Sequence, residues 1–167
     1  MKTKDAIRYS LTLADMAVTR ALEQVEDIPL TFPTEHGGCH PLWVVGHLAV
    51  VEGMTHEILT GRPNPVADWD ELFGRYSQAT ADASRYPTLA EARRRYSELR
   101  DANLTFLDSL SEAELDTPTR KQPEGLEEHF GTYGKALLTT ALHQTMHRGQ
   151  LTDAFRMAGR VETAVAA

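Results

Sequence analysis

The chain has 167 residues, a formal net charge of −7, 41% apolar residues and 25% charged residues, values typical of one globular domain. The one dense basic run, residues 93–95, is interpreted as the solvated face of a helix, so the sequence predicts no nucleic-acid partner. The longest apolar stretch, residues 41–51, is interrupted by Gly46 and His47 and is too short to cross a bilayer, so no membrane association is expected.

The cysteine content and the first residues bear on location. Cys39 is the single cysteine, which excludes an intrachain disulfide. Residues 1–7 are followed by polar and charged residues and lack the apolar segment of a secretory signal. Both features favour a cytoplasmic location. Because no linker or repeat interrupts the chain, we expect a single domain over residues 1–160 and a short tail over residues 161–167.

The first two predicted helices follow from apolar periodicity and from terminal residues. Apolar side chains recur every three or four positions between residues 5 and 25, which indicates an amphipathic helix. A second helix is expected from Pro41 to about Thr60, since proline suits a first helical turn and Gly61 suits a left-handed C-cap. This second helix is apolar nearly all the way round, as expected of a central helix.

The second half of the chain predicts two more helices after a long connection. Residues 62–87 contain several prolines and aromatic residues, and connections of this length often act as a lid or a pocket wall. A third helix is expected to follow the N-cap residue Thr88 and to end near Leu110. A fourth is expected to follow Thr132 and to end near residue 158. The predicted fold is therefore all-α, a four-helix bundle with a long crossover connection.

Two histidines in the fourth predicted helix form the first candidate site. His143 and His147 are four residues apart, so their rings lie on one helical face and can reach one ion. Gln144 stands where zinc proteases carry a glutamate, which disfavours a protease. The histidines lie on a seam flanked by apolar residues. Because unpaired buried polar groups are costly, a metal ion would satisfy both imidazoles at once.

His47 is the third candidate ligand and lies in the most apolar predicted helix. A lone histidine there is more often a core residue, but its combination with a buried pair favours a ligand. Three imidazoles leave a divalent ion with at least one position open to water or substrate. The residues do not select the metal: one zinc ion per chain is the default, with nickel, iron and manganese as alternatives.

Two strings of the sequence carry a resemblance to a known family. LWVVGHLA at residues 42–49, followed by Glu52, and HQTMHRGQL at residues 143–151 are similar to the two signatures of the DinB-like superfamily, which includes damage-inducible and YfiT-like proteins. The resemblance extends from the first helix to about residue 160 and implies a four-helix bundle with a metal site. Family members with known activities include thiol-dependent isomerases and S-transferases. By this match the metal ligands are His47, His143 and His147.

Two classes of function remain open at this level. The first is a metal-dependent enzyme that acts on a small molecule, either a hydrolase or a transferase or isomerase that uses a low-molecular-weight thiol. The second is a non-catalytic metal-binding protein of a stress response. A fourth side chain in the open position, such as Glu52 or His40, would favour the second class. A homodimer is also left open.

Several other residues receive weaker interpretations. Glu52 is a candidate hydrogen-bond partner of a ligand imidazole. Cys39, just before the second helix, is interpreted as a plain free thiol, and Gln150 as a structural residue. The long connection is expected to cover part of the metal pocket with its aromatic side chains, which are Trp69, Phe73 and Tyr76.

Overall fold

The computed structural model describes residues 1–24, 30–31 and 39–157. Its four long helices are α1 (Thr3–Glu23), α2 (Pro41–Thr60), α4 (Leu89–Ser109) and α6 (Tyr133–Met157). Five short helical segments fill the connections: η1 (Ala67–Trp69), α3 (Asp70–Phe73), η2 (Ala83–Arg85), η3 (Ala113–Asp116) and α5 (Glu127–Phe130). Across these described residues no strand forms, and one isolated β-bridge joins Pro118 to Thr132.

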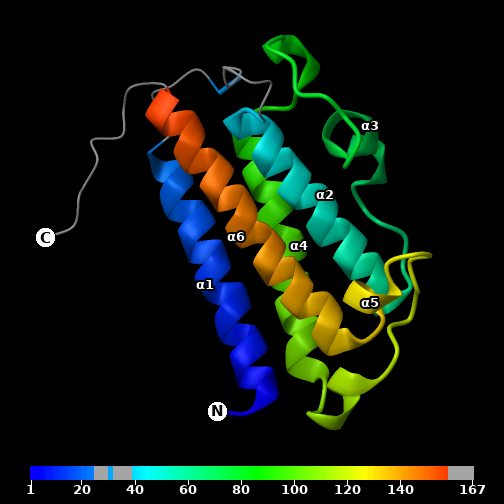
Figure 1. Cartoon of the computed structure of the whole chain (residues 1–167). Helices are drawn as coiled ribbons and strands as arrows, with labels where there is room; N and C mark the ends of the chain where they lie inside the picture. The colour runs from blue at the N-terminus through cyan, green and yellow to red at the C-terminus, as the bar shows by residue number, and fades with distance from the viewer. Residues whose placement is uncertain (25–29, 32–38, 158–167) are drawn as a thin grey trace, which may run out of the picture.

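The four long helices form a bundle in which neighbours in sequence are not always antiparallel (Figure 1). α1 and α6 run in one direction and pack along each other, whereas α2 and α4 run together in the opposite direction. α2 also packs against α6, and this contact brings the second and last helices together. The connection after α2 must travel back along the bundle before α4 can begin. The predicted all-α bundle with a long crossover is confirmed.

Capping residues explain where the helices α2 and α4 begin and where α2 ends. The ring Nδ1 of His40 accepts a hydrogen bond from the amide of Trp43 at 3.0 Å and caps the N-terminus of α2. Gly61 has φ 75° and ends the same helix in the left-handed conformation that glycine favours. The hydroxyl of Thr88 accepts from the amide of Glu91 and caps α4. These boundaries agree with the sequence predictions.

Three parts of the sequence predictions lie outside the described residues. The expected end of the first helix at residue 25 and that of the fourth at residue 158 cannot be compared with the structure, and the same holds for the tail over residues 161–167. Among the described helices, none is both long and apolar enough to cross a membrane.

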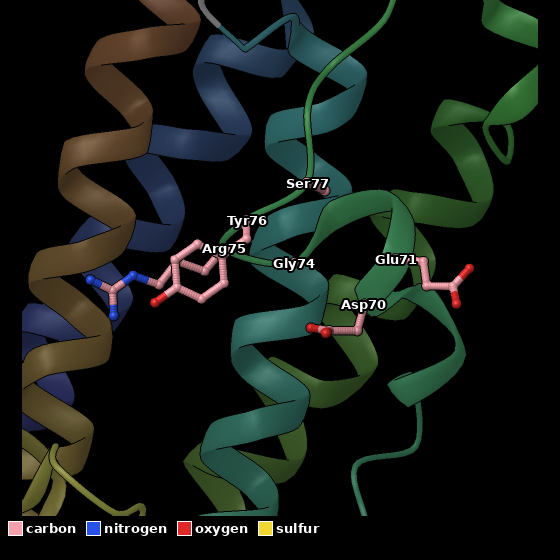
Figure 2. A pocket seen from close by; sticks show the side chains of 6 residues that line it. All are labelled: Asp70, Glu71, Gly74, Arg75, Tyr76 and Ser77. Carbon is pink, nitrogen blue, oxygen red and sulfur yellow. The ribbon is translucent and has the colours of Figure 1, made fainter.

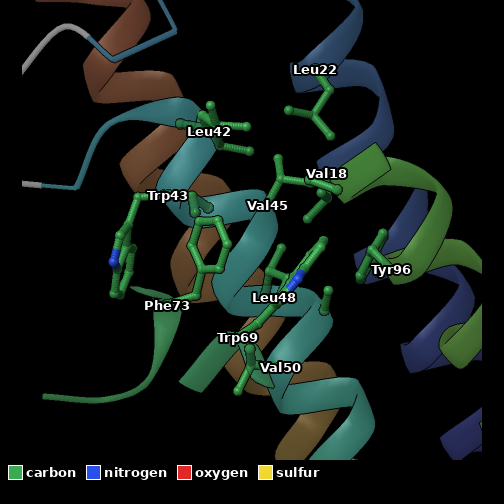
Figure 3. Close-up of a cluster of buried hydrophobic side chains, with 14 of the residues drawn as sticks. Val18, Leu22, Leu42, Trp43, Val45, Leu48, Val50, Trp69, Phe73 and Tyr96 are labelled. Carbon is green, nitrogen blue, oxygen red and sulfur yellow. The ribbon is translucent and has the colours of Figure 1, made fainter. Parts of the chain in front are cut away.

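The interior of the bundle has two apolar clusters separated along its length. One cluster joins the end of α1 to the first half of α2, and it includes Trp69 and Phe73 of the crossover (Figure 3). The other lies at the opposite end and joins the start of α1 to the start of α6. Trp69 and Phe73 are buried, whereas Tyr76 is 88% exposed and does not belong to the apolar cluster. The crossover is therefore part of the core through two of its three aromatic residues.

A buried polar layer lies between the two apolar clusters. The carboxylate of Glu52 accepts hydrogen bonds from Arg100 Nη1 at 3.0 Å and from Asn103 Nδ2 at 2.7 Å. The Gln144 amide bridges the pair, because its Nε2 donates to Glu52 and its Oε1 accepts from Arg100. Arg100 also donates to the carbonyl of Leu11. This layer therefore ties all four long helices to one another at mid-height.

Candidate metal centre

The three predicted ligands converge at the contact between α2 and α6. His143 Nε2 lies 3.4 Å from His47 Nε2 and 3.1 Å from His147 Nε2. His47 and His147 are buried, and His143 is partly exposed. In four-coordinate zinc sites the metal–nitrogen distance is about 2.0–2.1 Å, which places ligand nitrogens about 3.3 Å apart. These two separations match this spacing, and all three ligand nitrogens lie within 4.8 Å of one another, so the cluster could hold a metal ion.

The protonation state of the cluster suits metal binding. Burial, followed by the charges of the other two histidines, lowers the pKa of His143 to about 3. Burial and the nearby His47 lower the pKa of His147 to about 4. Burial also lowers the pKa of His47, although its hydrogen bond to Phe73 and the charge of Asp70 oppose this shift. Neutral imidazole, the form that binds metals, therefore predominates at neutral pH.

Hydrogen bonds on the far side of two rings fix the atoms that face the centre. His47 Nδ1 lies 2.6 Å from the carbonyl oxygen of Phe73, and His147 Nδ1 lies 2.7 Å from Oε1 of Gln150. Because a carbonyl oxygen only accepts, each Nδ1 carries the proton. Each Nε2 therefore presents a lone pair toward the other imidazoles, as in metal sites whose ligands are oriented by outer hydrogen bonds.

The ring of His143 leaves the hydrogen-bonding requirements of the three imidazoles unmet. His143 Nδ1 is buried and lacks a hydrogen-bond partner among the described residues. Its Nε2 faces the lone pairs of both His47 and His147, yet a neutral ring carries only one proton. Three nitrogens thus meet with at most one proton among them. A cation at the centre would satisfy all three, which is the observation that favours a metal over an internal hydrogen-bond network.

The crossover positions His47 from outside the bundle. A Cβ on Gly46 would lie 2.3 Å from the ring of Phe73, so glycine at this position permits the crossover to pack directly on α2. This contact brings the Phe73 carbonyl to His47. Trp43 stacks on the His47 ring, with centroids 4.7 Å apart and planes inclined by 10°, and donates from Nε1 to Ser77 Oγ at 2.9 Å. The His47 ring is therefore fixed by Trp43 of its own helix and by the Phe73 carbonyl of the crossover.

A surface pocket of about 430 Å³ lies on the crossover beside α2 (Figure 2). In this view the side chains of Arg75 and Tyr76 extend to the left of the other labelled residues, and the Arg75 guanidinium lies 5.5 Å from the centroid of the Tyr76 ring. The three histidines are not part of its lining, which consists of Asp70, Glu71, Gly74, Arg75, Tyr76 and Ser77. The pocket thus adjoins the residues that hold His47 without reaching the cluster itself.

The two candidates for a fourth ligand are engaged elsewhere. His40 uses Nδ1 to cap α2 and places Nε2 3.0 Å from the carbonyl of Thr80. Glu52 contacts Arg100, Asn103 and Gln144, so the expectation that it would contact a ligand imidazole is wrong. Within the described part of the chain, no other His, Cys, Asp or Glu joins the three histidines at ligand distance.

The lone cysteine also lies apart from the cluster. Burial raises the pKa of the Cys39 thiol, which disfavours the reactive thiolate. Its side chain packs at the edge of the apolar cluster formed by α1, α2 and the crossover. The remaining histidines have other surroundings: His56 Nδ1 lies 3.2 Å from Asn103 Oδ1, His129 is exposed, and His36 lies outside the described residues.

Three contributors to the cluster are not identified by the sequence interpretation. Gln150 is interpreted as structural, yet its amide oxygen faces His147. Its position three residues after a candidate ligand on one helix is the signal that indicates this contact. The Phe73 carbonyl carries no residue-type signal, because any residue could supply it. Trp43 lies four residues before His47, a spacing equally typical of ordinary core packing.

The fold and the cluster together define an all-helical protein that could hold a metal ion through three histidines. The family model of the DinB superfamily matches residues 10–151, and the chain belongs to this superfamily. This match confirms the resemblance carried by the strings around His47 and His143. No curated protein matches the chain.

Proposed function

We propose that this protein binds one divalent metal ion through His47, His143 and His147 and catalyses a transfer or isomerisation that uses a low-molecular-weight thiol. The observation that supports the metal is the convergence of the Nε2 atoms of these three residues. Hydrogen bonds at Nδ1 orient His47 and His147 so that their Nε2 lone pairs face the centre. When bound, a divalent ion supplies positive charge that favours deprotonation of a coordinating thiol. Zinc is the default ion for such a ligand set, with nickel, iron and manganese as alternatives.

The protein's own residues provide orientation and exclusion of water. The Phe73 carbonyl and the Gln150 side chain hold two imidazoles in one tautomer, and Trp43 covers one face of His47. His143 is the most exposed member of the cluster, so a small molecule would approach from its side. The Arg62–Pro87 segment, through the pocket beside α2, is proposed to shape the binding site of the electrophilic substrate.

The open coordination position supports an enzyme over a purely binding protein. Catalytic metal sites keep one position for water or substrate, whereas structural zinc sites use four protein ligands. His40 and Glu52, the two side chains considered for that position, are held in other hydrogen bonds. A non-catalytic stress-response role is therefore the less favoured proposal.

A hydrolase is the other enzymatic alternative, and the surroundings of the cluster disfavour it. Gln144 replaces the glutamate that serves zinc proteases, and its amide is bound to Glu52 and Arg100. No carboxylate joins the described cluster to act as a general base. A cytoplasmic location, where small thiols are reduced and Cys39 remains a free thiol, completes the proposal.

Metal analysis and a thiol assay test the two parts separately. Purified protein should carry about one transition metal per chain by mass spectrometry, and His143→Ala with His147→Ala should lose it. His129→Ala, at an exposed position, is the matched control and should keep it. Metal retained by the double variant would contradict the ligand assignment.

The metal-loaded protein is then incubated with glutathione, bacillithiol or mycothiol and a chromogenic electrophile. Turnover with at least one thiol that is lost in His47→Ala would support the thiol-dependent reaction. Equal rates for the two proteins with all three thiols would leave the metal site intact but contradict the proposed reaction.

A further inference from the structure

The indole of Trp43 lies against two of the three candidate ligands. It is stacked on His47 with ring centroids 4.7 Å apart, and its centroid lies 6.5 Å from that of His147. Trp43 precedes His47 by four residues, so both rings project from one face of α2. Because Trp43 is only 5% exposed, it shields the face of His47 that it covers from water. The orientation of this indole therefore bears directly on the metal centre.

One hydroxyl group of the crossover fixes the edge of the indole. Trp43 Nε1 donates to Ser77 Oγ at 2.9 Å, and Ser77 Oγ lies 2.9 Å from the carbonyl oxygen of Leu72. Since a carbonyl only accepts, the single hydroxyl proton of Ser77 is directed to Leu72, and the oxygen lone pairs are left for the indole. A buried indole N–H needs such an acceptor. The direction of the Trp43 ring therefore depends on this hydroxyl.

The turn that carries Ser77 also contacts His47 directly. The amide of Ser77 donates to the carbonyl of Gly74 at 3.0 Å, and the amide of Gly74 donates to the carbonyl of Asp70 at 2.8 Å. A Cβ on Gly74 would lie 2.4 Å from the Asp70 carbonyl oxygen, so the turn is tight. Phe73, in the same turn, places its carbonyl oxygen 2.6 Å from His47 Nδ1. A short, hydrogen-bonded segment thus holds the Ser77 hydroxyl at a set position relative to His47.

We infer that Ser77 is a positioning residue of the metal centre, whose hydroxyl holds the Trp43 indole flat against His47 and so fixes that imidazole. The inference rests on the proposed metal site and not on the proposed reaction. Without the hydroxyl, the indole N–H would lose its acceptor, and the ring would turn toward another acceptor and uncover His47. The His47 ring would then keep the Phe73 carbonyl but lose the stacked indole.

Proton NMR of the metal-free protein tests the stacking itself. The ring current of the indole shifts the carbon-bound ring protons of His47 upfield, and the spectrum of His47→Gln identifies these signals. In Ser77→Ala they should move downfield. Ser77→Thr keeps the hydroxyl, the adjoining pocket has room for its methyl group, and its signals should stay in place. Ser84→Ala is the matched control, because the Ser84 hydroxyl lies in the same crossover and bonds to Asp82.

Circular dichroism establishes that each variant is folded. Unmoved His47 signals in Ser77→Ala would overturn the inference. A spectrum of Ser77→Thr that matches that of Ser77→Ala would also overturn it, since the hydroxyl would then not be the group that matters.

Titration with Co²⁺ against a competing chelator tests the effect on the metal centre. We expect Ser77→Ala to bind Co²⁺ about tenfold more weakly, the lower end of the range for contacts behind metal ligands, and to shift the visible absorption bands of the ion. In a Trp43→Phe background, Ser77→Ala should have no further effect on affinity, because the hydroxyl acts through the indole. An equal loss in both backgrounds, or unchanged affinity and absorption in Ser77→Ala, would overturn the inference.

The two experiments separate this inference from the proposed function. If the unsubstituted protein binds no Co²⁺, the proposed metal site is wrong. The NMR comparison needs no metal, so it still decides whether Ser77 holds Trp43 against His47.

Discussion

The buried polar layer makes a strong prediction, because one of its two charged groups can be neutralised by a proton and the other cannot. Glu52 is 1% exposed and Arg100 is 2% exposed. Removing one member of a buried pair commonly costs about 3–5 kcal/mol, since the remaining charge stays buried without its partner. We expect Glu52→Gln and Arg100→Met each to lower the free energy of unfolding by about this amount at pH 8.

The two variants should respond differently to pH. Burial raises the pKa of Glu52 above its usual value, and Arg100 is the largest opposing influence. In Arg100→Met the pKa of Glu52 should therefore rise further. The pKa of Glu52 is lower in the unfolded chain than in the folded protein. At pH values between these two pKa values, the folded protein binds a proton that the unfolded chain does not, so stability increases as pH falls. In Glu52→Gln the guanidinium stays charged throughout. Arg100→Met should thus gain stability relative to Glu52→Gln between pH 8 and pH 5.5.

Urea unfolding followed by circular dichroism measures both effects. Chelator-treated protein is used so that metal binding does not add to stability. Glu98→Gln, which breaks the exposed pair with Arg94 on the same helix, is the matched control and should change the midpoint little. The double variant should cost less than the sum of the singles, since neither charge then remains. A loss of less than about 1 kcal/mol in the free energy of unfolding of either single variant would refute the reasoning. The same pH dependence of stability in both variants would also refute it.

Three further predictions concern the metal centre. Gln150→Ala removes the acceptor of His147 Nδ1, so metal affinity measured against a competing chelator should fall about 10–100-fold, whereas unchanged affinity would show that the contact is dispensable. Gly46→Ala inserts a methyl group into the Phe73 ring and should cost about 1–3 kcal/mol in urea unfolding; an unaltered midpoint would contradict the close packing. Cys39→Ser should leave metal content unchanged, because the thiol lies apart from the cluster, and loss of metal would make Cys39 a ligand.

The sequence predicts the long helices well because their boundaries depend on local chemistry. Pro41 and Gly61 act within one turn of α2, and Thr88 acts within the first turn of α4. The candidate ligands are equally accessible to sequence reasoning, since His143 and His147 have a recognisable spacing. Their packing against His47 depends on α2 meeting α6, a long-range contact that the family resemblance implies and local pattern does not.

The surroundings of the cluster are less predictable for physical reasons. The sequence predicts Glu52 near an imidazole, but its partner Arg100 lies 48 residues away in the chain, on a helix whose rotation no local signal specifies. In the same way, the oxygen that orients His47 belongs to a backbone carbonyl, so residue type carries no information about it. Gly46 lies where the crossover packs on α2, and a glycine within a helix does not by itself indicate which segment approaches it.

The separation of the three histidines along the chain has a consequence for biosynthesis. His47 and His143 are 96 residues apart, and two of the three imidazoles belong to the last helix of the described structure. A nascent chain that has not yet released α6 from the ribosome therefore contains a single member of the cluster. A metal ion held by all three residues could therefore bind only after translation of the whole bundle and docking of α6 on α2. A chain truncated within the α4–α6 connection would retain one histidine of the three and could not form the candidate three-histidine site.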